Sequence, residues 1–180
     1  MRQFGDVQLE QHGHVTVVEM QRPPYNFFDA ALVGWVRRNH NLLIGDATAE
    51  ALKWRVGAAA QLAEVRTMRV RGRDLPTGAP REVDVDSHDT AEALHDPVTH
   101  IRTIVLDALR EAPPEVAGDI HDRGLVLCGG GAALAALDRV LSDATHLPVL
   151  APEFPEQCVI NGAAALLDDP VLLERVAHVQ

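Results

Sequence analysis

The stretch "RGLVLCGGGAALAALDRVL", residues 123–141, decides how this chain folds. Its apolar residues, three glycines and second apolar run predict a strand over Leu125 to Cys128, a tight turn, and a helix over Ala132 to Leu141. The first N–H groups of such a helix lack backbone partners and carry the positive end of its dipole, so the turn favours polar or anionic ligands. Glycine also lets a flat ring or a phosphate approach the backbone closely. A tight connection without a ligand is the alternative, because the spacing fits neither the phosphate loop ending in Lys-Ser/Thr nor the dinucleotide fingerprint.

The segments around this stretch predict strands that alternate with helices, and hence an α/β core. Alternating apolar residues predict a hairpin over residues 7–20, and helical spacing of apolar residues predicts a helix that starts at Phe27. A second helix is expected from Asp46 or Thr48, either of which can cap it, with an apolar stripe that reaches Ala63. The remaining predicted elements are helices opened by Pro97 and Pro114, a short strand at Val149 and Leu150, and a helical tail from Gly162.

The clearest hairpin in the sequence is "RVRGRDLPTGAPREVDVDS", residues 69–87. Three arginines share one face of its first strand and three acidic residues share one face of its second, so antiparallel pairing sets opposite charges side by side. This pairing accounts for the dense basic run of the chain without any nucleic acid. The residues concerned are Arg69, Arg71, Arg73, Glu82, Asp84 and Asp86.

The composition bounds the classes of protein that this chain can belong to. A chain of 180 residues that is 47% hydrophobic can bury a core as one domain or two small ones. The formal net charge of −10 argues against a nucleic-acid partner, because a phosphate backbone requires a clustered positive face. No apolar run approaches the roughly 18 to 20 residues that span a bilayer, and the first residues lack the apolar centre of a signal peptide. We therefore expect a cytoplasmic protein.

The residue types that most often carry chemistry are scattered. Nine histidines show no spacing typical of a metal site or a catalytic triad, so neither a metal site nor a catalytic set is predicted. Cys128 and Cys158 lie in apolar stretches without a neighbouring cysteine or histidine at metal-ligand spacing. Buried, reduced thiols are therefore the expected state of both.

Glu50 and Lys53 form a second candidate site. They are three residues apart and so share one face of the second predicted helix, where they could hold a sugar from opposite sides. A solvated contact within the helix is the alternative interpretation of this pair.

Three long segments together resemble the C-terminal half of the MreB family, the bacterial actin-like proteins of cell-shape control. The resemblance runs from about residue 28 to 180, and its most specific motifs are "GRDLPTG" and "RGLVLCGGGAALAALDRVL". The segments are "VRRNHNLLIGDATAEALKWRVGAA" (36–59), "MRVRGRDLPTGAPREVDV" (68–85) and "ALHDPVTHIRTIVLDALREAPPEVAGDIHDRGLVLCGGGAALAALDRVLSDATHLPVLAPEFPEQCV" (93–159).

The resemblance implies an α/β fold, namely the second lobe of the actin-like, ribonuclease H-like ATPase fold. Residues 28–45 and 96–180 are then its larger subdomain, and residues 46–95 a small inserted α+β subdomain. In the family, the helix with Glu-x-x-Lys and the glycine-rich turn hold the adenosine part of ATP. The resemblance therefore implies that ATP or ADP is the cofactor, that Mg²⁺ enters only with the nucleotide, and that the contacts come from Glu50, Ala51, Leu52, Lys53, Gly129, Gly130, Gly131 and Ala132.

The chain also departs from the family pattern. The family's phosphate-binding hairpin, with its Asp-Gly-Gly-Gly-Thr-like motif, does not precede residue 28, and the whole first lobe has no counterpart. We therefore expect weak or absent nucleotide binding and no turnover by this chain alone. Residues 1–27 instead resemble the opening hairpin of the crotonase (enoyl-CoA hydratase) family. The later crotonase loops have no counterpart, so acyl-CoA chemistry is not expected.

Two classes of function stay open. The first is an actin-like nucleotide-binding protein of cell-shape control that self-associates or joins MreB filaments. The second is a non-catalytic interaction module, or a truncated remnant, that binds filaments or cell-shape partners without nucleotide. Family members contact membranes through the first lobe, so membrane contact is not expected of this chain.

Overall fold

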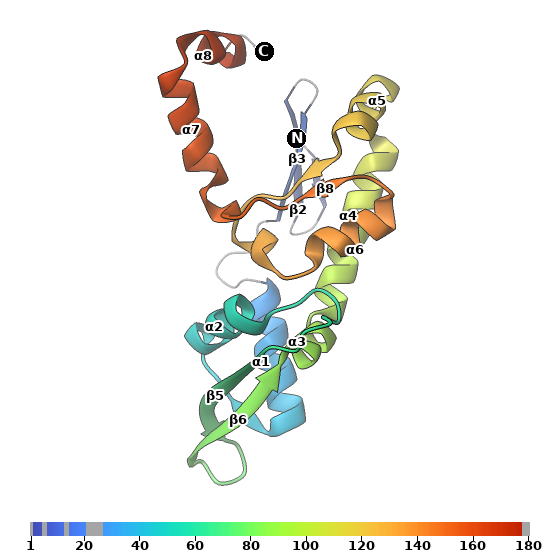
Figure 1. The fold of residues 1–180 in the computed structure, drawn as a ribbon. Coiled ribbons are helices and arrows are strands. Elements are labelled where there is room, and N and C mark those ends of the chain that lie inside the picture. The colour runs from blue at the N-terminus through green and yellow to red at the C-terminus, as the bar shows by residue number, and fades with distance from the viewer. Residues whose placement is uncertain (1, 5–6, 13–14, 21–26, 178–180) are drawn as a thin grey trace. The chain divides into compact units, whose positions relative to one another are not determined.

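The computed structural model describes residues 2–4, 7–12, 15–20 and 27–177. The chain forms two compact units (Figure 1). Unit 1 comprises Met1–Gln21, Ile104–Ala133 and Leu141–Gln180, and unit 2 comprises Arg22–Thr103 and Leu134–Val140. This grouping places residues 28–45 with 46–95, whereas the resemblance put them in the larger subdomain. The subdomain boundaries stay a prediction.

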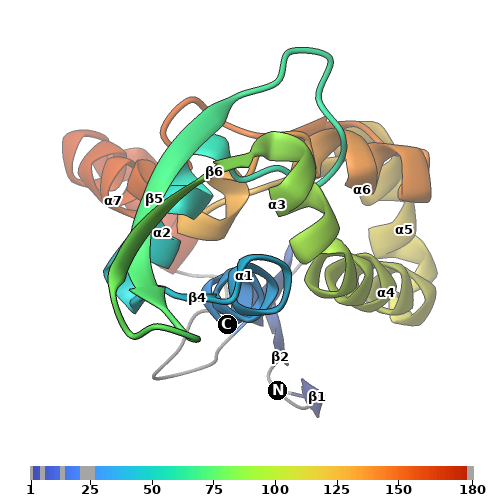
Figure 2. The same ribbon diagram turned by 90° about the horizontal axis from the view of Figure 1, so that it is seen from below.

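Unit 2 contains a three-stranded antiparallel sheet in the order β4-β5-β6, with helices packed beside it. Helix α2 packs on α1 and on β5, and Figure 2 shows α1 and α3 beside the curved β5–β6 ribbon. The elements are α1 (Phe27–His40), β4 (Leu42–Leu43), α2 (Asp46–Val56), β5 (Thr67–Asp74), β6 (Pro80–Asp86), α3 (Ser87–Ala93) and the first part of α4 (His95–Glu111).

Helix α1 forms where the apolar spacing predicts it. Phe28, Leu32, Trp35 and Val36 are buried on one stripe, because positions four and three apart fall on the same face of a helix. Asp29 lies in the first turn, and basic residues in the last turn complement the helix dipole. The buried stripe makes α1 the central helix of unit 2.

Helix α2 is shorter than expected. It ends at Val56 rather than continuing to Ala63, and Gly57 leaves the helical conformation with φ −60° and ψ 131°. The N-cap residue is Gly45, and no described side chain caps the helix, so the expected capping by Asp46 or Thr48 is wrong.

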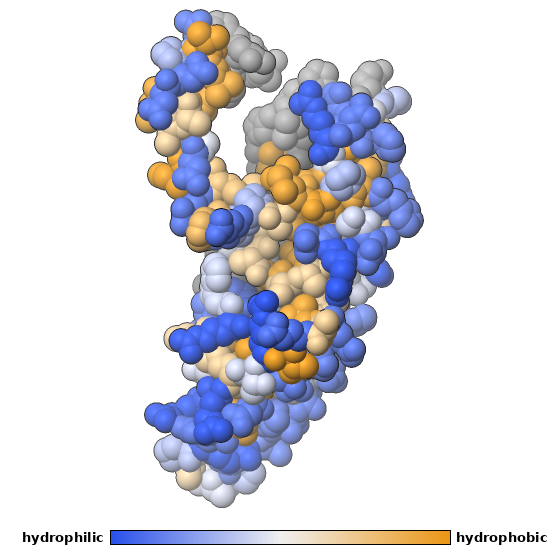
Figure 3. Space-filling model, in the orientation of Figure 1, coloured by the Kyte–Doolittle hydropathy of each residue, from blue (hydrophilic) through white to orange (hydrophobic). Residues whose placement is uncertain are grey.

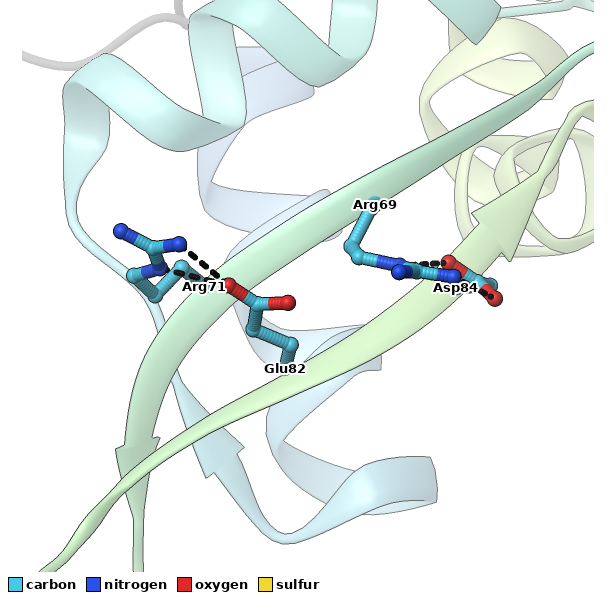
Figure 4. Close-up of polar contacts among 4 residues, drawn as sticks. All are labelled: Arg69, Arg71, Glu82 and Asp84. Atoms are coloured by element: carbon cyan, nitrogen blue, oxygen red, sulfur yellow. Dashed lines mark hydrogen bonds and ion pairs between the residues drawn. The ribbon is translucent and has the colours of Figure 1, made fainter.

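The β5–β6 hairpin has the predicted charge pairing (Figure 4). Arg69 lies opposite Asp84 and donates two hydrogen bonds to it, at 2.8 and 3.2 Å. Arg71 likewise lies opposite Glu82 and donates to it. The third arginine, Arg73, lies opposite Pro80. The predicted pairing of opposite charges is therefore confirmed for Arg69 and Arg71, whereas Arg73 and Asp86 do not lie opposite charged residues of the other strand.

Unit 1 contains two small sheets and the carboxyl-terminal helices. The predicted hairpin over residues 7–20 is confirmed by antiparallel pairing of β2 and β3, and β7 pairs in parallel with β8. The elements are β1 (Arg2–Phe4), β2 (Val7–His12), β3 (Val15–Met20), α5 (Pro114–Arg123), β7 (Leu125–Val126), the 3₁₀ helix η1 (Gly130–Ala133), β8 (Val149–Leu150), the 3₁₀ helix η2 (Pro155–Gln157), α7 (Cys158–Asp168) and α8 (Pro170–Ala177). Helix α6 (Leu137–Thr145) has residues in both units.

The glycine segment is not followed directly by an α-helix. The glycines enter the short helix η1, and α6 begins only at Leu137, so the expected helix over Ala132 to Leu141 is wrong in its start and its end. Ala136 has φ +63°, which interrupts helical geometry between the two elements. The carboxyl-terminal helix also starts earlier than expected, at Cys158 rather than Gly162.

Most of the described buried hydrophobic residues lie in unit 2. Of the described buried hydrophobic residues, only Val116, Ala132 and Leu141 belong to unit 1. Unit 1 also carries large exposed hydrophobic residues, and Figure 3 shows apolar side chains at several points along α7 and α8. The exposed residues of these two helices are Val159, Ile160, Leu167, Val171 and Leu173. Within the described ranges, no helix is both long and apolar enough to cross a membrane.

Candidate functional site

The first half of the candidate site is a buried lysine between two carboxylates in unit 2. Lys53, on α2, is only 5% exposed, and its Nζ lies 2.5 Å from Glu50 Oε2 on the preceding turn. Its Nζ is also 3.4 Å from Asp29 Oδ1, which α1 brings to the same place. Trp54 Nε1 donates to the second oxygen of Glu50 at 2.7 Å. The contact within the helix, which was the alternative interpretation of Glu50 and Lys53, is therefore present, but its lysine end is buried and not solvated.

The two carboxylates differ in their electrostatics. Burial raises the pKa of Asp29, and the nearby Lys53 charge only partly offsets that effect. Burial also acts to raise the pKa of Glu50, but hydrogen bonds from Lys53 and Trp54 outweigh it, so this pKa is lowered. Glu50 is thus the stronger partner of the ammonium group. Asp29 supplies a second negative charge that depends more on pH.

The other two residues of the "EALK" segment have different surroundings. Leu52 is fully buried, and its side chain supports the helix in the core of unit 2. Ala51 is half-buried. The ligand contacts predicted for Glu50, Ala51, Leu52 and Lys53 stay predictions.

The second half of the candidate site is the glycine segment of unit 1. Gly129 has φ +82°, a conformation that side chains disfavour, and a Cβ built on it would meet no other atom within 4 Å. Its N–H donates to Pro155 O at 2.7 Å, while its own carbonyl accepts from Ala132 N at 3.1 Å. Gly130 is exposed, Gly131 is half-buried and Ala132 is buried. The backbone at Gly129 is thus open to close approach from one side.

The two halves belong to different units. Glu50 and Lys53 lie in unit 2, whereas residues 129–132 lie in unit 1, and their meeting around one ligand stays a prediction. The chain nevertheless returns to unit 2 at Leu134. Three residues after Ala132, Ala135 N donates to Gly57 O at 3.3 Å, and Ala135 O accepts from Ala59 N at 2.8 Å.

Both thiols differ from their expected state. Cys128 is exposed and Cys158 is partly exposed, so the expectation that both are buried is wrong. Burial and the adjacent Cys158 thiol together raise the pKa of Cys128. Both cysteines are free, as expected. No group of three histidine, cysteine or carboxylate side chains among the described residues could hold a metal ion.

Asp29 and Trp54 belong to the lysine site although sequence reasoning missed them. Trp54 lies four residues after Glu50, and this helical spacing could have pointed to it. Asp29 is far from Lys53 in the chain, so only the packing of α1 on α2 brings it there.

Comparison with known proteins gives a consistent result. The family described as MreB/Mbl protein matches residues 6–175. The cell shape-determining protein MreB of Escherichia coli K12 is 47% identical over 141 residues, which are 78% of this chain and 41% of that protein. The chain thus spans about two fifths of the length of this curated relative. The likeness of residues 1–27 to crotonase hairpins stays a prediction.

Two solved structures share the fold. MreB5 of Spiroplasma citri bound to ADP superposes with a TM-score of 0.78 at 29% identity, over 91% of this chain and 49% of that one. A double helical filament of MamK superposes with a TM-score of 0.68 at 20% identity, over 86% of this chain and 46% of that one. At that identity the MamK likeness shows the fold alone, and it agrees with the expected actin-like α/β class.

Proposed function

The chain belongs to the MreB/Mbl family, and from this premise we propose that it binds the adenosine part of ATP or ADP weakly and does not hydrolyse ATP on its own. The premise makes it an MreB-like, actin-family protein of cell-shape control. The related MreB5 structures contain ADP or AMPPNP, which supports a nucleotide as the ligand class.

The observation that carries this proposal is the setting of Lys53. It is the only lysine of the chain, which also has fifteen arginines. A compact ammonium group on a buried stem offers three donors, and Glu50 and Asp29 hold it in one place. A site whose lysine is held in advance loses less side-chain entropy when a ribose or base binds.

Gly129 supports the same ligand class from the other half of the candidate site. Its positive φ and open side would let a flat ring lie against the backbone. The proposal keeps the adenosine contacts that the resemblance implies for residues 129–132.

The absence of turnover follows from what phosphoryl transfer requires. The reaction needs Mg²⁺, a held γ-phosphate and a positioned water, because charge stabilisation and alignment supply most of the rate. Residues 50–53 and 129–132 would contact adenosine and would leave the phosphates in water. Mg²⁺ would therefore enter this site only with the nucleotide.

Isothermal titration of the full chain with ATP, ADP and adenosine tests the proposal. We expect dissociation constants no tighter than about 0.1 mM, and within about threefold of one another, because the phosphates contribute no contacts. Lys53→Met should abolish the heat of binding, whereas Arg55→Met, an exposed change on the same helix, should leave it unchanged.

Two outcomes would contradict the proposal. Binding of ATP more than about tenfold tighter than adenosine would mean that the chain holds the phosphates, since tenfold corresponds to about 1.4 kcal/mol. Phosphate release that survives purification and is lost in Lys53→Met would overturn the absence of turnover. If none of the three ligands binds, the second candidate function replaces the first.

The second candidate is an interaction module that binds MreB-type filaments without nucleotide. The exposed apolar residues of α7 favour it, because Val159, Ile160 and Leu167 are 81%, 67% and 79% exposed. Large apolar side chains that are this exposed often mark a surface that contacts another protein. The assembled MamK relative is a filament, which supports self-association within the wider fold class.

Co-sedimentation with full-length MreB separates the two candidates. A nucleotide-binding partner should pellet with the filaments to a different extent with and without ATP. An interaction module should pellet equally in both conditions, and Ile160→Glu on α7 should then release it. Glu64→Gln, an exposed change in unit 2, is the matched control.

A further inference from the structure

The two cysteines of the chain lie on segments that unit 1 holds together. Cys128 precedes Gly129, whose N–H donates to Pro155 O at 2.7 Å. On its other side, Leu127 N donates to Leu150 O at 2.9 Å. Helices η1 and η2 are in contact, and Cys158 follows η2 as the first residue of α7. Backbone bonds on both sides therefore fix where Cys128 lies relative to the start of α7.

Both thiols are at least partly accessible to solvent and lie on segments that are bonded to each other. Cys158 adds to the effect of burial in raising the pKa of Cys128, and both thiols are free. Cys158 Sγ also lies 3.9 Å from Phe154 O, which keeps its side chain on the η2 side of the helix. Cys128 is exposed and Cys158 is partly exposed, whereas free cysteines are among the most buried residues in proteins. Reagents in solution can thus reach this pair.

We propose that Cys128 and Cys158 form a redox modification site, at which a low-molecular-weight disulfide such as oxidised glutathione generates an intramolecular disulfide. This bond ties the residue before the glycine segment to the first turn of α7. The sulfurs have to close to about 2.05 Å, and the segments that carry them are already bonded to each other.

The reaction is two thiol–disulfide exchanges. The exposed Cys128 thiolate attacks one sulfur of oxidised glutathione, forms a mixed disulfide and releases one glutathione thiolate. The Cys158 thiolate then attacks the Cys128 sulfur and releases the second glutathione. Two protein thiols are oxidised, one oxidised glutathione is reduced to two thiols, and the two protons lost by the cysteines are taken up by the released glutathione thiolates.

The rate of this reaction depends on pH. Burial and the neighbouring Cys158 raise the pKa of Cys128, so the thiol form dominates at neutral pH. Only the thiolate attacks. As long as the pH is below that pKa, each increase of one pH unit therefore raises the rate of the first step about tenfold. The pair responds to a sustained oxidising balance of glutathione and not to a brief pulse.

Mass spectrometry of the full chain, equilibrated in glutathione buffers of increasing oxidised fraction, tests the proposal. We expect a species lighter by two hydrogens, at a fraction that is independent of protein concentration, with a tryptic peptide pair joined through Cys128 and Cys158. Cys158→Ser should stop at a stable glutathione adduct on Cys128, and Cys128→Ser should not form the linked peptide. The oxidised chain should unfold at a higher urea concentration than the reduced chain, because the bond restricts the unfolded state.

Three results would overturn the proposal. They are a wild-type chain that keeps a glutathione adduct on Cys128, a chain that stays unmodified, and disulfide-linked dimers whose fraction grows with protein concentration. The wild-type measurement requires no substitution, so a variant that fails to fold does not affect it. The readout involves no nucleotide, and its outcome is therefore separate from that of the proposed function.

Discussion

Lys53 has its only described ion-pair partners in Asp29 and Glu50. A buried ammonium group requires such partners, because burying an unpaired charge costs much free energy. The spacing of Glu50 and Lys53 offered one of these contacts as its alternative interpretation, although as a solvated pair. The contact with Asp29 was not predictable, since it depends on how two helices pack and not on any local spacing.

A double-mutant cycle of Asp29→Asn and Lys53→Met measures the contact with Asp29. We expect a favourable coupling of about 1 kcal/mol in the free energy of unfolding at pH 7, from urea denaturation of the four proteins. Because burial raises the pKa of Asp29, this carboxyl takes up a proton earlier than usual as the pH falls, and the coupling should fall with it. Asp46→Asn with Lys53→Met is the matched control, and a coupling equal to this control at pH 7 would contradict the contact.

At the scale of elements, the sequence was most informative where a local pattern is supported by tertiary packing. The β5–β6 hairpin and α1 formed as predicted, because alternation or helical spacing agrees with the buried face. The end of α2 and the start of α6 did not form as predicted. At Gly57, a Cβ would lie 2.2 Å from Lys53 O, so the conformation at the end of α2 has no room for a side chain. The spacing of apolar residues contains no information about this steric limit.

The charged hairpin makes a testable contribution to the pH dependence of stability. A hydrogen bond from Arg69 lowers the pKa of Asp84 in the folded chain. The carboxylate therefore stabilises the fold above its ordinary pKa, and this contribution is lost as the pH falls through the lowered value. Asp84→Asn should lose less stability than the wild type between about pH 5 and pH 2, as measured by chemical denaturation at each pH.

Arg69→Met provides the control for that measurement. This variant should lose the same pH-dependent part of the free energy of unfolding as Asp84→Asn. The double variant Arg69→Met, Asp84→Asn should show no further change in that pH dependence. A wild type and an Asp84→Asn variant with parallel pH profiles would show that the Arg69 contact adds nothing to stability.

At the scale of the whole molecule, the uneven burial is the main feature that sequence reasoning did not anticipate. Composition predicted a chain able to bury a core, yet nearly all the described buried hydrophobic residues belong to unit 2. Helices α7 and α8 carry apolar residues that no described residue covers. Their sequence spacing alone is that of an ordinary amphipathic helix, so it did not predict this exposure.

Hydrogen exchange followed by mass spectrometry should reveal this difference. Amides of α1 and β5 should exchange at least about a hundredfold more slowly than amides of α7, because local opening costs less where few apolar contacts are buried. Peptides from α5 serve as the internal reference within unit 1. Equal protection in α1 and α7 would contradict the expected order.

The solitary lysine has a practical consequence. Apart from the chain's own amino terminus, Lys53 is the only primary amine in the molecule. Reductive methylation with isotope-enriched formaldehyde would accordingly place one observable methyl signal beside Glu50 and Asp29, and its chemical shift would report occupancy and ionisation at that point without any engineered label.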